Sequence, residues 1–368
     1  MTHDIKRLCD HKKDRLRAVE NAREGALNSK AISCVHAIAA AGILMFSSYA
    51  ATTAFGEDAS GVPDSALKGK KVAYVACSDL NRWCRKGRSL IIGALQAKGV
   101  IVTDLQDPYD PVLQAQHLDQ AIAQKPDLIV LLATNARSVV PGLRRAKAAG
   151  IPVINFVGPT VPESQEFFLA SIENGHRQLG EFAATNLVEG LKKEGRTTGN
   201  IIVVTGAQVQ PEVAVRMDGF KSVMDKYPEY KVVDIQDGNW DQGKTADIAR
   251  TLFAKYADKG GVQGAFGMAD HMAAGIIEAA HQAGIPVGVD NNGLVVVASN
   301  CFEIGMVNIG KGLQYGTSTQ AADPTAAFAI PLIEKALAGE NIPKRSLMEE
   351  SRITKDNVEQ WRAICGGA

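Results

Sequence analysis

Short apolar runs alternate with longer stretches of helical period from Lys70 onward, and this alternation limits the fold more than any other feature. Each run is apolar almost throughout, which is typical of strands buried on both faces of a parallel sheet. In the first half the predicted strands are 71–76, 100–105, 127–132 and 151–156. Helical spacing follows them around 90–95, at 113–122 and at 136–149, and Gly150 closes the last of these helices as its C′ residue.

The second half repeats the pattern. Its predicted strands are 200–205, 230–235, 264–267 and 294–298. The predicted helices are centred near Glu181, Ala214, Ile248, Ile276 and Ile330. Alternation of this kind implies right-handed βαβ units. We therefore predict an α/β protein with two similar doubly wound parallel-sheet lobes and a ligand crevice at the carboxyl ends of the strands.

The first 55 residues differ from the rest. A basic region at 1–30 precedes an apolar run at 31–46 and small residues at 47–54, which together are typical of a signal peptide. The apolar run is shorter than the roughly 20 residues that a membrane span needs, although a single anchor remains the alternative. We expect residues 1–55 to be removed on export to the periplasm.

Charge and cysteine content narrow the function. Lys plus Arg and Asp plus Glu number 40 each, so nothing supports nucleic-acid binding. Beyond the leader, Cys77, Cys84, Cys301 and Cys365 can pair in an oxidising compartment. Cys77 and Cys84 flank one short loop and are the expected pair, but connectivity stays open. Their spacing does not suit zinc, and we expect no metal and no cofactor.

Several segments in order resemble the ribose/galactose-type (class I) periplasmic sugar-binding proteins of ABC importers. The resemblance covers roughly residues 69–360 and rests on 126–132, 146–154, Arg216-Met-Asp-Gly-Phe220, Ala269–Gly275 and Thr319-Gln320. Each segment alone is weak evidence, but their order and spacing together are specific.

The resemblance implies two lobes joined by three hinge crossings. Lobe one would comprise 69–172 and 321–349, and lobe two 173–320 and 350–363. Closure of such lobes on a ligand is a hinge motion, and a membrane permease then receives the closed form. We expect a monomer. Glu173 and Asn174 are predicted to cap the helix after the first crossing.

The family's ligand-binding positions map onto seven residues here, namely Asn81, Trp83, Arg216, Trp240, Asp270, Asn300 and Gln320. The resemblance implies that the two tryptophans face the ligand from opposite lobes. It also implies that Arg216 hydrogen-bonds ring hydroxyls. Sugars present apolar C–H faces and hydroxyls, so flat aromatics with polar side chains suit them.

Departures from the family pattern put ribose, glucose and galactose in doubt. The family's Asp-Arg pair after the fourth strand reads Val157-Gly158, and a stacking aromatic is replaced by Cys84. The binding Asn before Asp270 is Ala269. We therefore expect a small polar ligand, a sugar or polyol, without naming it.

Each candidate has an ordinary alternative. A tryptophan commonly packs in a core, and Arg216 could be a helix-surface residue paired with Glu212 one turn away. Residues Gly238–Thr245 also match the P-loop spacing G-x-x-x-x-G-K-[ST], which suggests a nucleotide-binding enzyme. Trp240 and Asp241 inside that loop argue against close wrapping of phosphate.

No nucleophile elbow or motif-borne carboxylate pair is present, so we predict no enzyme activity. A periplasmic sensor for a chemoreceptor or kinase is the main alternative to an import component, and the sequence does not separate them. A transcription regulator of this fold is disfavoured because residues 1–55 resemble an export segment.

Overall fold

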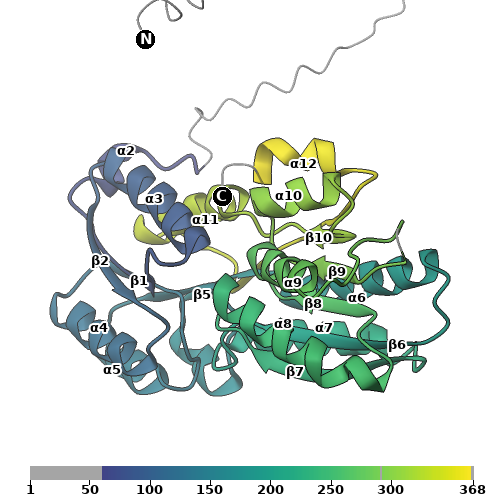
Figure 1. The fold of residues 1–368 in the computed structure, drawn as a ribbon. Coiled ribbons are helices and arrows are strands. Elements are labelled where there is room, and N and C mark those ends of the chain that lie inside the picture. Colours follow the sequence, from purple (N-terminus) through teal and green to yellow (C-terminus); the bar gives the residue numbers. More distant parts are fainter. Residues whose placement is uncertain (1–59, 291, 366–368) are drawn as a thin grey trace, which may run out of the picture. The chain divides into compact units, whose positions relative to one another are not determined.

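The structure, a computed structural model, describes residues 60–290 and 292–365, so the predicted signal peptide lies outside the described residues. Two six-stranded sheets form the centres of two lobes, shown in Figure 1. Within the described part of the chain, none of the helices combines the length and the apolar character that a membrane crossing requires. The predicted two-lobed α/β fold is confirmed.

The sheet of lobe one is parallel throughout, in the order β11-β5-β4-β3-β1-β2. Its strands are β1 (Lys71–Cys77), β2 (Ile101–Asp107), β3 (Leu128–Leu131), β4 (Val153–Val157), β5 (Ala170–Asn174) and β11 (Arg345–Met348). Its helices are α2 (Asp64–Leu67), α3 (Arg82–Ala97), α4 (Pro111–Ala123), α5 (Val140–Ala148), the 3₁₀ helix η1 (Pro162–Phe167) and α11 (Ala322–Leu337). The four predicted strands of the first half correspond to β1–β4.

Alternate residues of β1 belong to different packing layers. Val72 and Tyr74 share a buried cluster with α3 and α11, whereas Ala73 and Val75 share another with α4 and α5. Because successive side chains of a strand point to opposite faces, the sheet is covered on both sides. Figure 1 shows α11, late in the sequence, lying beside α3.

The sheet of lobe two has the order β12-β10-β9-β8-β6-β7 and is parallel except between β10 and β12. Its strands are β6 (Gly199–Thr205), β7 (Tyr230–Asp237), β8 (Gly264–Gly267), β9 (Val295–Ala298), β10 (Gly316–Ser318) and β12 (Arg352–Thr354). Its helices are α6 (His176–Lys193), α7 (Pro211–Met224), α8 (Gln242–Tyr256), the 3₁₀ helix η2 (Ala257–Lys259), α9 (Asp270–Gln282), α10 (Glu303–Gly310) and α12 (Val358–Cys365). A disulfide between Cys301 and Cys365 ties α12 to the segment before α10.

The chain passes between the lobes after β5, after β10 and between β11 and β12. Glu350, at the third crossing, is buried and accepts hydrogen bonds from Asn174 (2.9 Å) at the first and from Thr319 (2.8 Å) at the second. One carboxylate thus joins all three crossings. Burial raises the pKa of Glu350, and the bonds from Asn174 and Thr319 oppose that rise.

Two local predictions were wrong. Helix α5 begins at Val140 and not near 136, because the Asn135 side chain accepts from the backbone N–H groups of Arg137 and Ser138 and holds a turn there. Glu173 and Asn174 end strand β5 and do not cap α6; the N-cap residue of α6 is Gly175.

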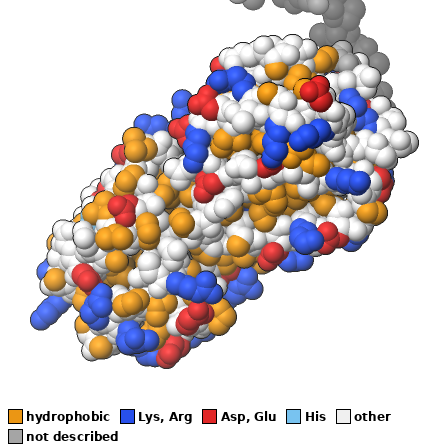
Figure 2. Space-filling view, turned by 60° about the horizontal axis from the view of Figure 1, so that its bottom comes forward, with side chains coloured by type: hydrophobic (Ala, Val, Ile, Leu, Met, Phe, Trp, Pro, Cys, Tyr) orange, Lys and Arg blue, Asp and Glu red, His pale blue; other side chains and the backbone are white. Residues whose placement is uncertain are grey.

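Charged side chains of both signs are interspersed over the face shown in Figure 2.

Candidate functional site

A small cavity of about 40 Å³ lies between the lobes, at the carboxyl ends of the strands. Lobe one lines it with Cys77, Asn81, Trp83, Cys84, Tyr109, Leu132 and Val157. Lobe two and the second crossing line it with Gln210, Glu212, Arg216, Trp240, Asn300 and Gln320. Six of the seven predicted ligand-binding residues are therefore brought to one cavity.

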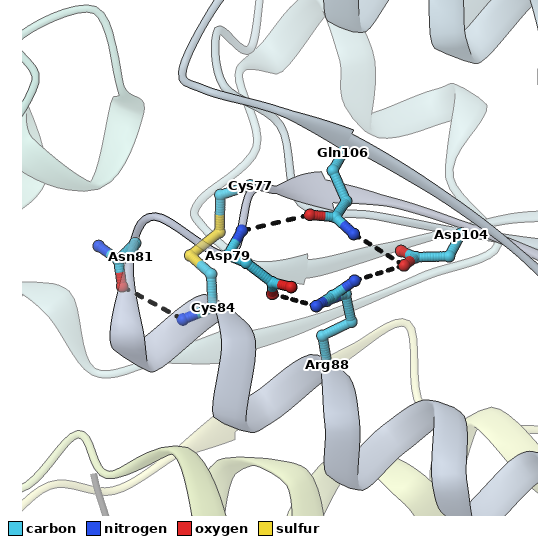
Figure 3. Close-up of polar contacts among 7 residues, drawn as sticks. All are labelled: Cys77, Asp79, Asn81, Cys84, Arg88, Asp104 and Gln106. Atoms are coloured by element: carbon cyan, nitrogen blue, oxygen red, sulfur yellow. Dashed lines mark hydrogen bonds and ion pairs between the residues drawn. A yellow bond between two sulfur atoms is a disulfide. The ribbon is translucent and has the colours of Figure 1, made fainter.

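The loop after β1 forms the lobe-one wall and is fastened at both ends (Figure 3). Cys77 and Cys84 form a disulfide, which confirms the expected pair. Asn81 is the N-cap residue of α3, because its Oδ1 accepts from the backbone N–H of Cys84 at 3.2 Å. The Nδ2 of Asn81 donates to the Tyr109 hydroxyl at 2.8 Å. Asn81 is thus immobilised by bonds within the protein.

A polar network on the outer side of this loop holds it against β2 (Figure 3). Arg88, in the second turn of α3, contacts the carboxylates of both Asp79 and Asp104. Gln106 accepts from the backbone N–H of Asp79 at 3.2 Å and donates to Asp104 at 2.9 Å. The disulfide and this network fix the loop before any ligand is present.

Trp83 lines the cavity and also packs in a buried hydrophobic cluster. The residue is 7% exposed, and its ring stacks on Phe156, with centroids 6.5 Å apart and planes at 28°. Its Nε1 donates to the backbone oxygen of Gln320 at 2.8 Å. Because Gln320 lies at the second crossing, Trp83 connects lobe one to the hinge, and its contact with a ligand stays a prediction.

Arg216 lies at the centre of the site and is 1% exposed, which excludes the helix-surface alternative. Its Nη1 donates to the Met268 backbone oxygen, the Ser299 hydroxyl and the Asn300 Oδ1, at 3.0, 2.9 and 2.8 Å. Its Nη2 donates to Gln320 Oε1 at 2.7 Å. Burial lowers the pKa of Arg216 to about 10, so the guanidinium stays charged at neutral pH.

His176 is a site residue that the sequence analysis missed. The Nη2 of Arg216 donates to its Nδ1 at 3.0 Å, so its Nε2 carries the proton and donates to the Val157 backbone oxygen at 3.0 Å. Burial and the Arg216 charge hold the pKa of His176 well below its usual range. This neutral imidazole bridges the lobe-one wall and the buried arginine.

Trp240 closes the cavity from lobe two. Its ring centroid lies 5.7 Å from the Arg216 guanidinium carbon, within cation–π range, and its Nε1 donates to Gln210 Oε1. Trp240 and Asn81 also line an outer cavity of about 590 Å³ that His271 and Phe302 border. Trp240 and Asn81 therefore belong to the wall that the two cavities share.

Several cavity residues hold strained backbone. Tyr109, Val157, Trp240 and Asn300 have φ between 56° and 77°, a region that side chains with a Cβ rarely adopt. Val157 is β-branched, which makes its conformation especially unfavourable. Strain of this kind persists where the surrounding structure over-determines it and is concentrated at functional sites.

Asp270 was predicted to bind ligand, and the structure does not place it at the cavity. It is fully buried, and its carboxylate accepts from the backbone N–H of Phe302 at 3.0 Å and from Gln314 at 2.7 Å. Burial raises the pKa of Asp270 to about 7. Its carboxylate holds the segment before α10, and we remove it from the candidate ligand set.

Glu212 lines the cavity and was considered only as a surface partner of Arg216. It is 6% exposed, and its Oε2 has no hydrogen-bond partner within residues 60–290 and 292–365. Burial raises the pKa of Glu212 to about 7 against the opposing effect of Arg216. The four-residue spacing to Arg216 was visible in the sequence, but it did not indicate that both residues face a cavity.

The P-loop alternative fails on local geometry. Asp241 is the N-cap residue of α8, and its Oδ1 accepts from the Lys244 backbone N–H at 2.6 Å. A phosphate at this helix start would compete with a carboxylate for that N–H group and would be repelled by it. The segment is a capped helix start beside the inner cavity.

The sequence is similar to those of known binding proteins. Residues 72–341 match the family model described as "Periplasmic binding protein domain". The chain is 26% identical over 248 residues to a D-apiose import binding protein of Paraburkholderia graminis, covering 67% of this chain and 74% of that protein. It is 23% identical over 330 residues to a xylitol-binding protein of Mycolicibacterium smegmatis, covering 89% and 87%.

A solved structure of a galactofuranose binding protein superposes with a TM-score of 0.73 at 15% identity, over 80% of this chain and 98% of that chain. Its fold is therefore the fold found here, and the family model spans most of both lobes. The predicted resemblance is confirmed, and the chain belongs to the periplasmic binding protein family.

Proposed function

We propose that this protein captures a small uncharged sugar or polyol between its lobes, outside the cytoplasmic membrane, and delivers it to the permease of an ATP-driven importer. The names of the relatives support a cargo of this class. The observation that carries the proposal is the Arg216 guanidinium, held rigidly by acceptors from several segments beneath the Trp240 ring. An aromatic face beside a fixed donor suits the C–H face and hydroxyls of a sugar.

Entry of such a ligand requires the lobes to part. The inner cavity of about 40 Å³ is far below the roughly 300–1,000 Å³ of ordinary ligand pockets. The lobes also contact each other outside the cavity, for example where Asn135 Nδ2 donates to the Val209 backbone oxygen at 3.4 Å. Rotation at the three crossings around Glu350 would open the cavity, as in hinge closure generally.

A thermal-shift screen tests the proposal. The protein lacking residues 1–55 is heated with xylitol, D-apiose, D-ribose, myo-inositol and ATP in separate samples. A ligand at a hundredfold excess over Kd stabilises the folded state by about 2.7 kcal/mol, which raises the melting temperature visibly. We expect a shift with at least one sugar or polyol and none with ATP.

Two tryptophan variants locate the binding site. Trp240→Ala should weaken binding of the active compound by tenfold or more, since it removes the aromatic face. Trp361→Ala, a partly buried tryptophan on α12, serves as the matched control and should leave affinity unchanged. A shift with ATP alone, or equal losses in both variants, would contradict the proposal.

A further inference from the structure

The lobe-one wall of the cavity is apolar at the end of β4, where Val157 lines the cavity and Gly158 follows it, so neither residue brings a polar side chain. Glu212, from lobe two, reaches this stretch. A Cβ placed on Gly158 would lie 3.2 Å from Glu212 Oε2 and 3.8 Å from Pro211. The carboxylate therefore crosses from the start of α7 to the backbone of the opposite lobe, and a larger residue at 158 would crowd it.

Glu212 and Arg216 lie one turn apart on α7 and both line the cavity. Among the residues that the structure describes, each keeps one buried polar atom without a partner, the acceptor Oε2 of Glu212 and the donor Nε of Arg216. A buried unpaired polar atom is costly, and a ligand that pairs with it recovers that cost. Two residues that line the cavity thus supply one unused acceptor and one unused donor.

A role for Glu212 in helix stability alone does not explain its position. An acidic residue in the first turn interacts favourably with the helix dipole while it stays exposed to water. Glu212 is 6% exposed, and burial of an ionisable carboxylate is unfavourable unless it is paired. Its burial at the cavity points to a ligand partner.

A hydroxyl group is the chemistry that fits this pair. It donates to a carboxylate oxygen and accepts from a guanidinium N–H, so neighbouring hydroxyls of one uncharged molecule satisfy both atoms. A ligand carboxylate would pair with Arg216 but would face the negative charge of Glu212 a few ångströms away. The two side chains together favour uncharged polyhydroxy compounds over the corresponding acids.

We propose that Glu212 is a specificity-determining residue that binds hydroxyl groups of an uncharged sugar or polyol and excludes sugar acids. This inference rests on the proposed function and narrows its ligand class. Glu212 supplies, from lobe two, the polar group that faces the apolar Val157–Gly158 stretch of lobe one.

Isothermal titration calorimetry at pH 8 tests this inference. Burial raises the pKa of Glu212 to about 7, so its carboxylate is ionised at that pH. The probes are xylitol and D-ribose, with D-xylonate and D-ribonate as their acidic counterparts. The variants are Glu212→Gln, which keeps the shape and removes the charge, and Glu212→Ala. Glu278→Gln, at an exposed position of α9, is the matched control.

We expect the wild type to bind an uncharged probe. We expect it to bind the corresponding acid at least tenfold more weakly than that uncharged probe. Glu212→Gln should lose about tenfold in affinity for the uncharged probe, because bonds to charged acceptors are stronger than neutral ones. It should also bind the acid at least tenfold more tightly than the wild type does. Melting temperatures of the variants check that each one folds.

The outcomes separate the two proposals. Unchanged affinity for the uncharged probe in Glu212→Gln, or wild-type preference for the acid, overturns the role of Glu212 and leaves the solute-binding function standing. Absence of binding to every uncharged probe by the wild type overturns both. Parallel losses in Glu212→Gln and Glu278→Gln would also refute a specific role.

Discussion

Replacing Gly206 with alanine should weaken ligand binding by displacing the indole of Trp240, without deleting any atom of the candidate site. Gly206 follows β6, and a Cβ placed on it would overlap the Trp240 ring. Even the third-nearest ring atom, Cδ2, would lie only 2.5 Å away, against 3.4 Å for ordinary contact. Gly206 does not have a positive φ, so its backbone accepts alanine and the ring must retreat by at least about 1 Å.

The size of the effect follows from what the ring loses. Retreat stretches the hydrogen bond from Nε1 to Gln210, worth about 0.5–1.5 kcal/mol, and the cation–π contact with Arg216, worth about 0.5–1 kcal/mol. Both contacts shape the closed site, and the ring also supplies the proposed ligand face. A loss of about 1.4 kcal/mol in binding corresponds to tenfold in Kd, and we expect a loss of about that size.

Calorimetric titration with the compound that gives the largest thermal shift measures this effect. Gly206→Ala, Trp240→Ala and the double variant form a cycle, in which a clash with Trp240 makes the double variant bind like Trp240→Ala alone. Gly93→Ala is the control, since Gly93 is exposed on α3 and an added Cβ there has no heavy atom of the described residues within 4 Å. Additive losses in the cycle would refute the reasoning.

Two further predictions concern stability. In the chain-entropy model, loss of the Cys77–Cys84 disulfide, with a separation of 7 residues, costs about 2.5 kcal/mol of unfolding free energy, and loss of Cys301–Cys365, with a separation of 64, about 4 kcal/mol. Guanidinium unfolding of the two double serine variants measures both, and the reverse order would contradict the model. Because burial raises the pKa of Asp270 from 3.8 to about 7, the folded state keeps a proton that the unfolded chain has lost between these values. The unfolding free energy contributed by this group therefore falls as pH rises through that interval and levels off above it; Asp270→Asn should reduce the slope by up to about 1.4 kcal/mol per pH unit. Urea unfolding at pH 5 and pH 7 measures the slope, and an unchanged slope would show that Asp270 is ionised in the folded protein.

The sequence predicted the strands that are buried on both faces, because such strands need a continuous run of apolar residues. The runs at 71–76 and 200–205 are continuous because helices cover both faces of the parallel sheets, and they became β1 and β6. Strands β5 and β10–β12 were not predicted. They are three to five residues long and contain polar residues, since they lie beside the crossings where side chains such as Asn174 form hydrogen bonds. These strands form because of tertiary contacts, and no hydrophobic periodicity in the sequence marks them.

The candidate site was predictable in part for the same reason. Trp83, Trp240 and Arg216 follow strands in the sequence, and the parallel topology brings the ends of those strands together. Asp270 follows β8 just as closely, yet its carboxylate points to the buried N–H of Phe302. His176 was missed because its partners, Val157 and Arg216, are separated from it by 19 and 40 residues.

Glu212 shows what the sequence did not reveal, namely which side of helix α7 faces the cavity. The buried residues of α7, such as Val213 and Phe220, do not by themselves fix which side of its N-terminal turn faces the cleft. A close crossing with α6 fixes that side. A Cβ on Gly180 would overlap the backbone of α7 at Arg216 and Phe220, and one on Gly219 would overlap the backbone of α6 at Arg177. These glycines let the two helices touch backbone to backbone, which sets the rotation of α7 and turns Glu212 and Arg216 toward the cavity. A glycine in each of two consecutive helices was visible in the sequence, but only the structure shows that they meet.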